Sequence, residues 1–534
     1  MAPNPLDAAF DNVVEKLLKD WHIPGLSVSV VHNDDSWSKA YGLAHRSPSK
    51  DQKAEPTTLF YAASTTKAQL CAVWSIYMRS SANTSKPKSE RISWTTPLVD
   101  LIGDDFVLSD AARSRQVTLE DAVSHRTGMP RHELCYGKEG PTTVGDVTRH
   151  LRHLPLHHEL RTQFEYCNTM YMAATHALET VTGMDLAQVF HEWLWEPLGM
   201  GRTYAGYSEA ERGVREKGEV LAKSYYWTKL PGTQGYGEGE YKEQPYMNFP
   251  EVSGAGEVIS TADDYAKWIR ALLSSSSPLG AEMIKDLWTP RSLVTDENDM
   301  QAPYDGNLLA YGLGWFISSY RGYKCVWHPG GIIGAGSLVM LVPELKWGMA
   351  FFGNGNDVGM TLRGLPFALL DKMLGVEEVD QGGMARVEKA VMEQFGKLGK
   401  EGKEKMYPAA PKRPQVKLAL PIEDYAGTYR CKSYGRITFS MTKKGSTPVV
   451  CTSEEEKEKK VLAFLIDNKT WTSHLTLEHV NAEFWLGTKS MIDSPIHRPF
   501  KAESRVGVDG KVERFGLVME EAMPDTLIWF RREG

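Results

Sequence analysis

The sequence predicts an α/β fold: an antiparallel sheet flanked by helices, with a helical subdomain, followed by a C-terminal antiparallel β-barrel. Segments that alternate between apolar and polar residues, as strands do, lie near residue 30 and again between residues 311 and 353. Helical patterns dominate residues 57–270, and short alternating segments return after Pro421. We therefore expect two domains, at residues 1–375 and 416–534, joined by a charged linker at residues 376–415.

The first domain begins with an amphipathic helix at residues 10–21, which Pro24 and Gly25 end. Residues 26–32 then alternate as a strand and residues 37–41 return, which predicts a hairpin. The elements predicted after it are helices at 64–79, 119–124, 168–182 and 262–273, strands at 323–328, 337–342 and 347–353, and a helix at 362–374. Because strands at both ends enclose the helices, we expect one sheet built from distant segments.

The C-terminal part is predicted to contain a linker and a barrel. A weak apolar stripe in the linker predicts a helix that rests on its own domain, and its residues are Val387, Val391, Phe395 and Leu398. Short strands with barrel-like spacing are predicted at residues 427–430, 436–441, 461–466, 476–479, 483–486, 515–519 and 527–530. Residues 454–460 mix both signs of charge, which predicts a solvated loop.

Composition excludes several classes of partner. The chain carries 61 basic and 68 acidic residues, so its net charge is −7 and no basic surface favours nucleic acid or anionic membranes. Six cysteines without a CxxC pair predict reduced thiols. Asp7, Asp11 and Glu15 lie where a secretory signal needs an apolar stretch. We therefore expect a cytoplasmic protein that acts on a small molecule; its oligomeric state is not indicated.

Metal and nucleotide motifs are not found in the sequence. It contains no HExxH and no GxxxxGK segment, and the GxSxG pattern of many hydrolases is also missing. His150, His153, His157 and His158 crowd together, but Pro155 interrupts the helix that would align them and no acidic or cysteine partner lies at ligand spacing. We interpret the histidines as a surface cluster and expect no metal and no cofactor.

The pattern Ser-x-x-Lys occurs five times, so most of its occurrences must be chance: Ser36/Lys39, Ser47/Lys50, Ser64/Lys67, Ser85/Lys88 and Ser440/Lys443. Only Ser64/Lys67 opens a long predicted helix, where the spacing of three residues places both side chains on one face. The same face continues with apolar residues, and burial would lower the pKa of Lys67 toward that of a usable base. The simpler alternative is a surface lysine beside a helix-capping serine.

Two later segments extend this pattern. Tyr166-Cys167-Asn168 precedes a predicted helix, and Trp-His-Pro-Gly-Gly at residues 327–331 ends a predicted strand. In order and spacing, they and residues 64–67 resemble the serine β-lactamase and penicillin-binding-protein-like superfamily, specifically its class C branch. Four further segments also resemble sequences typical of this superfamily and extend the resemblance over residues 10–375: residues 23–25, 119–128, 254–264 and 311–315. Residues 421–534 resemble the lipocalin-like C-terminal domain of some D-aminopeptidases.

The resemblance implies acyl transfer through a covalent acyl-enzyme. Ser64 would be the nucleophile, and Lys67 and Tyr166 would share the removal of its proton and its delivery to the leaving group. The choice between Lys67 and Tyr166 as acylation base stays open. Asn168 would hold Lys67 or a substrate carbonyl.

The strand segment at residues 328–331 would complete the site. The backbone N–H groups of Ser64 and Gly331 would form the oxyanion hole beside Gly330, since Pro329 has no N–H. Bacterial members of the superfamily have lysine where this chain has His328. A neutral imidazole attracts a substrate carboxylate only weakly, so we expect uncharged substrates to be preferred, with protonation of His328 below about pH 6.5.

The sequence therefore predicts a Ser-x-x-Lys serine hydrolase of small-molecule esters, amides, lactones or lactams. An acyltransferase similar to the transesterases of polyketide pathways would use the same residues, and a scaffold without catalysis is the alternative of another class. A tyrosine-rich stretch is predicted either to wall an acyl site or to pack on its own domain: Tyr225, Tyr226, Trp227, Tyr236, Tyr241, Tyr246 and Phe249.

Overall fold

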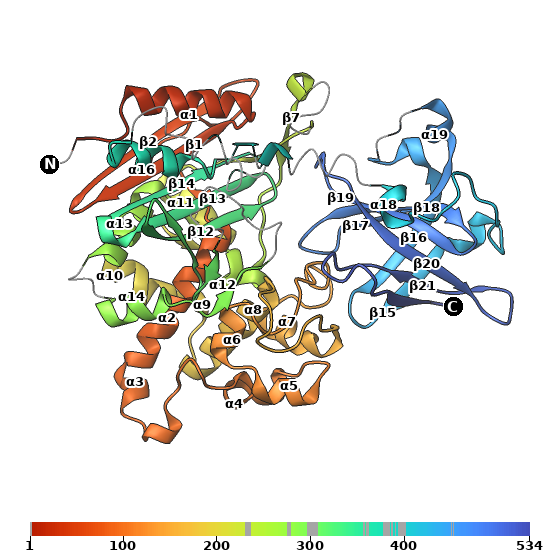
Figure 1. Cartoon of the computed structure of the whole chain (residues 1–534), viewed down its shortest axis with the longest axis horizontal. Coiled ribbons are helices and arrows are strands. Elements are labelled where there is room, and N and C mark those ends of the chain that lie inside the picture. The colour runs from red at the N-terminus through yellow and green to blue at the C-terminus, as the bar shows by residue number, and fades with distance from the viewer. Residues whose placement is uncertain are drawn as a thin grey trace.

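A nine-stranded antiparallel sheet is the largest element of the computed structural model (Figure 1). The structure describes residues 3–229, 236–274, 279–295, 308–355, 362–376, 402–449 and 453–534, with residues 358, 385, 388, 389, 391–393 and 451. The strand order is β3-β2-β1-β14-β13-β12-β11-β10-β9. The strands are β1 (Gly25–His32), β2 (Asp35–His45), β3 (Gln52–Lys53), β9 (Ser292–Leu293), β10 (Ala310–Tyr311), β11 (Phe316–Tyr320), β12 (Tyr323–Ile332), β13 (Ala335–Val342) and β14 (Trp347–Gly353).

The sheet joins the two ends of the first domain, as predicted. β1 pairs with β2 in the expected hairpin and with β14 on its other side, where Leu26 faces Gly353. Residues more than 300 positions apart therefore become neighbours at the centre of the sheet. Strand β14 covers the predicted residues, whereas β12 extends beyond the predicted strand to Ile332.

Both faces of the sheet are covered, because alternate residues of the central strands point to two separate cores. On one face, Leu26, Val28 and Val30 pack with buried side chains of α1 (Ala8–Asp20) and α16 (Leu365–Met373). On the other face, Val31 packs in the core shared with the helices. α13 (Ala262–Leu273) lies on that second face, in contact with β1 and β14.

The helical subdomain follows the first hairpin and lies below the sheet in Figure 1. Two helices, α8 (Asn168–Thr182) and α13, span the predicted residues, and α6 (Leu119–Val123) ends one residue early. The remaining helices are α2 (Thr66–Arg79), α3 (Ser81–Thr84), α4 (Leu98–Ile102), α5 (Ala111–Gln116), α7 (Val144–His150), α9 (Leu186–Phe190), α10 (Glu196–Leu198), α11 (Tyr207–Lys217), α12 (Ser253–Gly256) and α14 (Ala281–Leu287). Two small sheets, β4-β8-β5 and β6-β7, complete this sheet-and-helix domain (residues 3–376).

The C-terminal part is a closed antiparallel barrel of eight strands, which confirms the predicted barrel. Its strands are β15 (Gly427–Cys431), β16 (Gly435–Lys443), β17 (Lys460–Ile466), β18 (Ser473–Asn481), β19 (Phe484–Met491), β20 (Arg498–Val506), β21 (Val512–Leu517) and β22 (Ile528–Arg532). Strand β20 was missing from the sequence prediction. The segment predicted as a loop at 454–460 instead begins with the short helix α19 (Glu454–Glu458).

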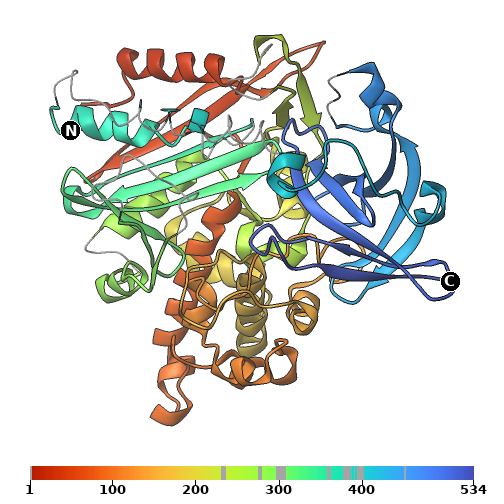
Figure 2. The same cartoon turned by 45° about the vertical axis from the view of Figure 1, so that its right-hand side comes forward.

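The barrel lies against one side of the sheet-and-helix domain, as both views show (Figures 1 and 2). Buried His132 is held at this junction, because its Nδ1 accepts a hydrogen bond from the Tyr434 hydroxyl at 2.6 Å and its backbone N–H donates to Glu520 at 2.7 Å. Lys469 donates to the Glu139 carbonyl at 3.0 Å. A cavity of about 1270 Å³ lies at this junction and is lined by residues of both domains.

The linker prediction is only partly covered by the structure. Val391 is buried in the core that contains α1 and α16, whereas Val387, Phe395 and Leu398 lie outside the described residues. Among the described residues, α18 (Lys403–Met406) precedes the barrel. No helix in the described part of the chain has the length and apolar character needed to cross a membrane.

Candidate active site

Ser64 lies on a tight turn at the start of α2. Residues Ala63–Thr65 form a 3₁₀ turn, so the α-helix itself begins two residues after the predicted start. Ala63 has φ of +48°, a strained conformation for a residue with a Cβ, and strain of this kind gathers at functional sites. The Thr66 hydroxyl donates to the Ala63 carbonyl at 2.7 Å and stabilises the turn. The turn leaves Ser64 half-buried, and the turn itself contacts β12 and β13.

Lys67 lies one helical turn further along, with its amine directed at Ser64. The Lys67 Nζ donates to Ser64 Oγ at 3.2 Å and to the Ala255 carbonyl at 2.7 Å. The side chain is fully buried, so the predicted burial is confirmed. Burial, with a smaller contribution from the positive charge of Arg131, holds the pKa of Lys67 well below its usual range. A neutral amine at this distance is able to accept the Ser64 proton.

Tyr166 packs directly on Lys67. The Lys67 Nζ lies 4.9 Å from the centre of the Tyr166 ring and 5.2 Å from that of Tyr171. The structure thus brings together the three residues predicted to be catalytic. Tyr171, on α8, was not among the predicted site residues, because an aromatic residue within a predicted helix does not by itself indicate a site.

His125 is a further site residue that sequence reasoning missed. Its ring centre lies 4.3 Å from that of Tyr166 and 4.9 Å from that of Tyr311. His125 Nδ1 accepts the backbone N–H of Cys167 at 3.0 Å, so Nε2 carries the ring proton. Burial, and then the positive charge of Lys67, holds the pKa of His125 well below its usual range. A neutral His125 therefore supports the backbone that presents Tyr166.

Arg131 and Glu133 lie on the same side of the site as the Tyr166 ring. The Arg131 guanidinium lies 4.7 Å from the centre of the Tyr166 ring, and its Nε lies 3.3 Å from Glu133 Oε1. Asn168 Nδ2 donates to Glu133 Oε1 at 2.8 Å. Asn168 was predicted to hold Lys67 or a substrate carbonyl, but its donor is engaged by Glu133. Its buried Oδ1 has no partner among the described residues and is the atom left for another donor.

His328 is buried instead of facing the substrate. It is fully inaccessible, and its Nδ1 lies 2.7 Å from the Pro329 carbonyl and therefore carries the proton. Its Nε2 accepts the hydroxyl of Tyr311 at 3.0 Å. Burial, and then the charge of Lys67, lowers the pKa of His328 to about 3. The expectation that His328 protonates below about pH 6.5 is therefore wrong.

The glycines of β12 set the distance between the sheet and the nucleophile turn. A Cβ on Gly330 would lie 2.4 Å from the Ala62 carbonyl and 2.2 Å from Ser337 Oγ, so only glycine lets the strand approach the turn this closely. At Gly331, which is exposed, an added Cβ would meet nothing within 4 Å. Open space in front of Gly331, beside Ser64, suits a reacting carbonyl near two backbone N–H groups.

Two of the other Ser-x-x-Lys pairs lie on strands, in surroundings that differ from those of Ser64 and Lys67. Ser36 and Lys39 lie on strand β2, where Lys39 pairs with Asp11 at 2.6 Å. Ser440 is an exposed residue of strand β16, as predicted. Tyr246, which like Tyr166 is followed two residues later by an asparagine, donates to the Leu221 carbonyl at 2.9 Å and so has a structural partner.

The tyrosine-rich stretch forms the hairpin of β6 (Ser224–Trp227) and β7 (Tyr241–Gln244). Its aromatic rings pack on the sheet-and-helix domain: Trp227 stacks on His22 at 3.8 Å, and Arg46 lies 4.1 Å from the Tyr241 ring centre. The Tyr225 backbone N–H donates to the Gly334 carbonyl at 2.9 Å, in the turn that follows β12. The hairpin is thus fixed beside the glycine segment of the site.

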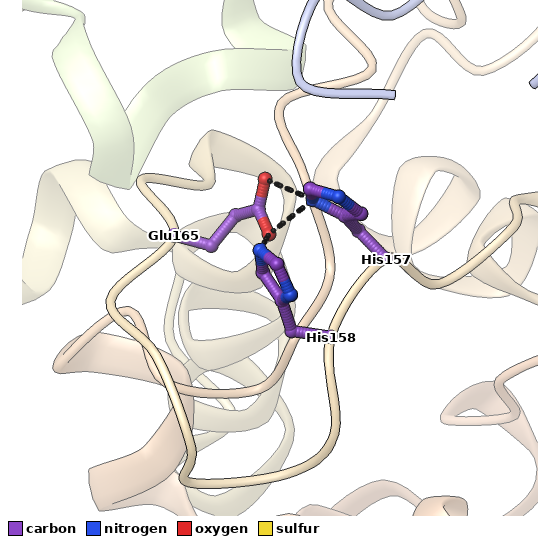
Figure 3. A group of neighbouring side chains, drawn as sticks. All are labelled: His157, His158 and Glu165. Atoms are coloured by element: carbon purple, nitrogen blue, oxygen red, sulfur yellow. Dashed lines mark hydrogen bonds and ion pairs between the residues drawn. The ribbon is translucent and has the colours of Figure 1, made fainter. Parts of the chain in front are cut away.

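The histidine cluster is corrected by the structure. The sequence indicated no acidic partner for these histidines, yet the Glu165 carboxylate contacts both His157 and His158, whose ring centres lie 3.7 Å apart (Figure 3). His157 Nδ1 is 3.0 Å and His158 Nε2 is 3.5 Å from Glu165 Oε2. Glu165 directly precedes Tyr166, so this group lies beside the site.

Fold and site together define a serine hydrolase with a β-lactamase fold. The chain belongs to the Beta-lactamase family, whose family model matches residues 10–370. Similarity to "Unguisins hydrolase ungD′" of Aspergillus campestris reaches 34% identity and covers 99% of this chain and 93% of that protein. "Unguisins hydrolase ungD" of Aspergillus violaceofuscus is 32% identical, with 99% and 91% covered.

Solved structures agree on the fold. An octameric penicillin-binding protein homologue from Pyrococcus abyssi aligns over 98% of this chain and 99% of its own, with a TM-score of 0.59 and 17% identity. A class C β-lactamase from Rhodobacter sphaeroides aligns with 70% of this chain and 99% of its own, with a TM-score of 0.51 and 17% identity. The alignment with the Pyrococcus protein spans both domains. The alignment with the β-lactamase covers about as much of the chain as the Beta-lactamase family model does.

Proposed function

We propose that this serine hydrolase cleaves small-molecule ester, amide, lactone or lactam bonds through a covalent acyl-enzyme on Ser64. The observation that carries the proposal is the contact between Ser64 Oγ and the fully buried amine of Lys67 at 3.2 Å. Burying an amine at this cost has no use in a scaffold, but it supplies a base beside a nucleophile.

In the proposed reaction, Ser64 Oγ attacks the substrate carbonyl as Lys67 accepts its proton. The backbone N–H groups of Ser64 and Gly331 stabilise the oxyanion, and Tyr166 passes the proton to the leaving group. Water then attacks the acyl-enzyme and releases Ser64.

A role for Asn168 in substrate binding requires that its Nδ2 exchange Glu133 for a substrate carbonyl, because its Oδ1 is buried. Two relatives of nearly the same length are named as hydrolases of unguisins, so unguisins are the first substrates to test. Transfer of the acyl group to an alcohol or amine would use the same steps. Analysis of the products formed with added alcohols or amines distinguishes this transfer from hydrolysis. A small-molecule substrate, without nucleic-acid or membrane partners, and a cytoplasmic location are likewise proposed.

The decisive experiment is intact-mass spectrometry after incubation with activated-ester and β-lactam probes. We expect one acyl adduct per chain on the wild type and none on Ser64→Ala. The matched control is Ser440→Ala, which removes a serine of the same motif on the barrel and should label as the wild type does. Labelling that persists in Ser64→Ala would refute the proposal.

A further inference from the structure

Three possible metal ligands converge beside the catalytic tyrosine. His157 Nδ1, His158 Nε2 and the Glu165 carboxylate all lie within 4.8 Å of one another, and the three side chains point toward one another (Figure 3). Two belong to the segment after Pro155, and the third to the segment that leads into α8. Neither segment forms a helix or strand at these residues, so their backbones meet only in the folded protein.

The separations between the ligand atoms suit a small cation. His157 Nδ1 lies 3.2 Å and 3.0 Å from the two Glu165 oxygens, and His158 Nε2 lies 3.5 Å from Oε2. Zn²⁺ takes nitrogen and oxygen ligands at about 2.0–2.2 Å, so neighbouring ligands of a tetrahedral site lie about 3.3 Å apart. The distances from the two imidazoles to the carboxylate fall on both sides of that value.

Accessibility and charge also favour a cation. The two imidazoles are about a quarter exposed, at 28% and 26% for His157 and His158, whereas Glu165 is 9% exposed. A cation can therefore enter from solvent and still meet a largely desolvated carboxylate. Glu520 of the barrel adds a second negative charge that acts on His157. A neutral imidazole that binds a metal through one nitrogen carries its proton on the other nitrogen.

We propose that His157, His158 and Glu165 form a binding site for one divalent transition-metal ion, with Zn²⁺ as the best fit. Two imidazoles and one carboxylate suit Zn²⁺ better than they suit Mg²⁺ or Ca²⁺. A water molecule would take the fourth coordination position of the zinc ion. The ion would fix Glu165, whose backbone N–H donates to the His125 carbonyl at 2.7 Å and whose next residue is Tyr166. The site would act on the position of Tyr166, without touching the substrate.

The test is metal binding by the full-length protein after removal of bound metal with a chelator. We expect one Zn²⁺ per chain by native mass spectrometry, and a Co²⁺ derivative with the visible absorption of low-coordinate cobalt bound to nitrogen and oxygen. His158→Ala and Glu165→Gln should each weaken Zn²⁺ binding by at least about 100-fold, since each removes a direct ligand. Zinc at about 100 times its Kd should raise the Tm of the wild type by about 3 °C.

His153→Ala is the matched control, because it removes a histidine of the same segment that lies outside the group; it should bind Zn²⁺ as the wild type does. Thermal melts of the metal-free variants show whether each is folded before its affinity is compared. Equal Zn²⁺ affinity in the wild type, His158→Ala and Glu165→Gln would overturn the proposal. A sulfur-to-cobalt charge-transfer band would do so as well, since it assigns the metal to cysteines. In either case the three residues form only a hydrogen-bonded group.

Discussion

Two charged side chains of opposite sign act on the pKa of Lys67. Arg131 lowers the pKa of the Lys67 amine and Glu133 raises it, although burial is the larger cause of its lowered value. The two residues contact each other at 3.3 Å. The base strength of Lys67 is therefore set in part by a pair of side chains outside the predicted motif.

The pH dependence of acylation should reveal this arrangement. Lys67 accepts a proton only as a neutral amine, so the acylation rate falls at pH values below its pKa. Removing the positive charge in Arg131→Gln stabilises the ammonium, raises the pKa of Lys67 and moves the acid limb to higher pH. Glu133→Gln removes an attraction and should move the same limb to lower pH. Stopped-flow acylation with an uncharged ester measures both, and shifts in the same direction would contradict the assignment.

Glu257 provides a second titration, unrelated to catalysis. Burial, and then repulsion from Glu251 and Glu209, raises its pKa from 4.5 to about 8. The pKa of Glu257 is higher in the folded protein than in the unfolded chain. The protonated carboxyl therefore adds stability below pH 4.5, and that stability is lost as the pH rises through about 8. Glu257→Gln keeps a neutral side chain at every pH.

We therefore expect the Tm of Glu257→Gln to equal that of the wild type near pH 5 and to exceed it by a few degrees near pH 9. The exposed Glu216, changed to Gln, is the control and should show no such divergence. A Tm difference that does not grow with pH would show that Glu257 ionises normally.

The pair at Ser64 and Lys67 was predictable because local spacing on a helix places both on one face. The arrangement at Glu165 was not, since nothing local indicates that residues 157–158 fold back against residue 165. His328 shows the opposite limit: its position on a strand was predicted, but the Tyr311 hydroxyl that buries its Nε2 comes from another strand.

At the scale of elements, the contact between β12 and the nucleophile turn controls the site. Ser337 on β13 donates to the Ala62 carbonyl at 2.7 Å and ties the sheet to the turn from the neighbouring strand. Gly330 leaves the space in which this contact forms.

Paired substitutions at adjacent glycines should separate packing from substrate access. In Gly330→Ala the new methyl group would overlap the Ala62 carbonyl, so we expect a loss of about 1–3 kcal/mol in the free energy of unfolding, and a lower acylation rate. Gly331→Ala meets open space, so its Tm should stay at the wild-type value. Thermal or urea unfolding measures both, and equal destabilisation of the two variants would refute the close approach.

The central strands and long helices could be predicted, because continuous apolar alternation or a helical period marks them. β20 could not. Its inward-facing residues Phe500, Ala502 and Ser504 are mostly small or polar, and charged residues separate them, so the alternation is weak. Its place is fixed by pairing with β19 and β21, which is information from the closed barrel and not from the segment itself.

At the scale of the molecule, the barrel supports the segment that carries Arg131 and Glu133. Buried His132 lies between these two residues and is bonded to Tyr434 and Glu520 of the barrel. We expect the first domain to carry the chemistry and the barrel to shape the site; this stays a prediction, as do the boundaries at residues 375 and 416. The hydrogen bonds of His132 connect the barrel to the segment that carries Arg131 and Glu133, so the barrel is able to affect the site through them.

Tyr434→Phe should loosen this segment selectively. Loss of the hydroxyl leaves buried His132 Nδ1 without its partner, at a cost of about 1–3 kcal/mol. We expect faster hydrogen exchange at residues 131–139, together with a lower acylation rate. Tyr429→Phe is the control, because its hydroxyl donates to the Tyr425 carbonyl within the barrel. Exchange at 131–139 that is unchanged in Tyr434→Phe would show that the junction does not support the segment.

The position of β1 in the middle of the sheet has a consequence for how the chain is made. β1 emerges from the ribosome early, whereas its partner β14 ends at Gly353. At about 5–20 residues per second, the apolar side chains of β1 wait roughly 15–60 s for that partner. During that interval β1 is paired with β2 on one side only, and its other edge has no partner until β14 is made. An unpaired strand edge favours association with other chains, so a chaperone that covers this edge during translation should raise the yield of folded protein.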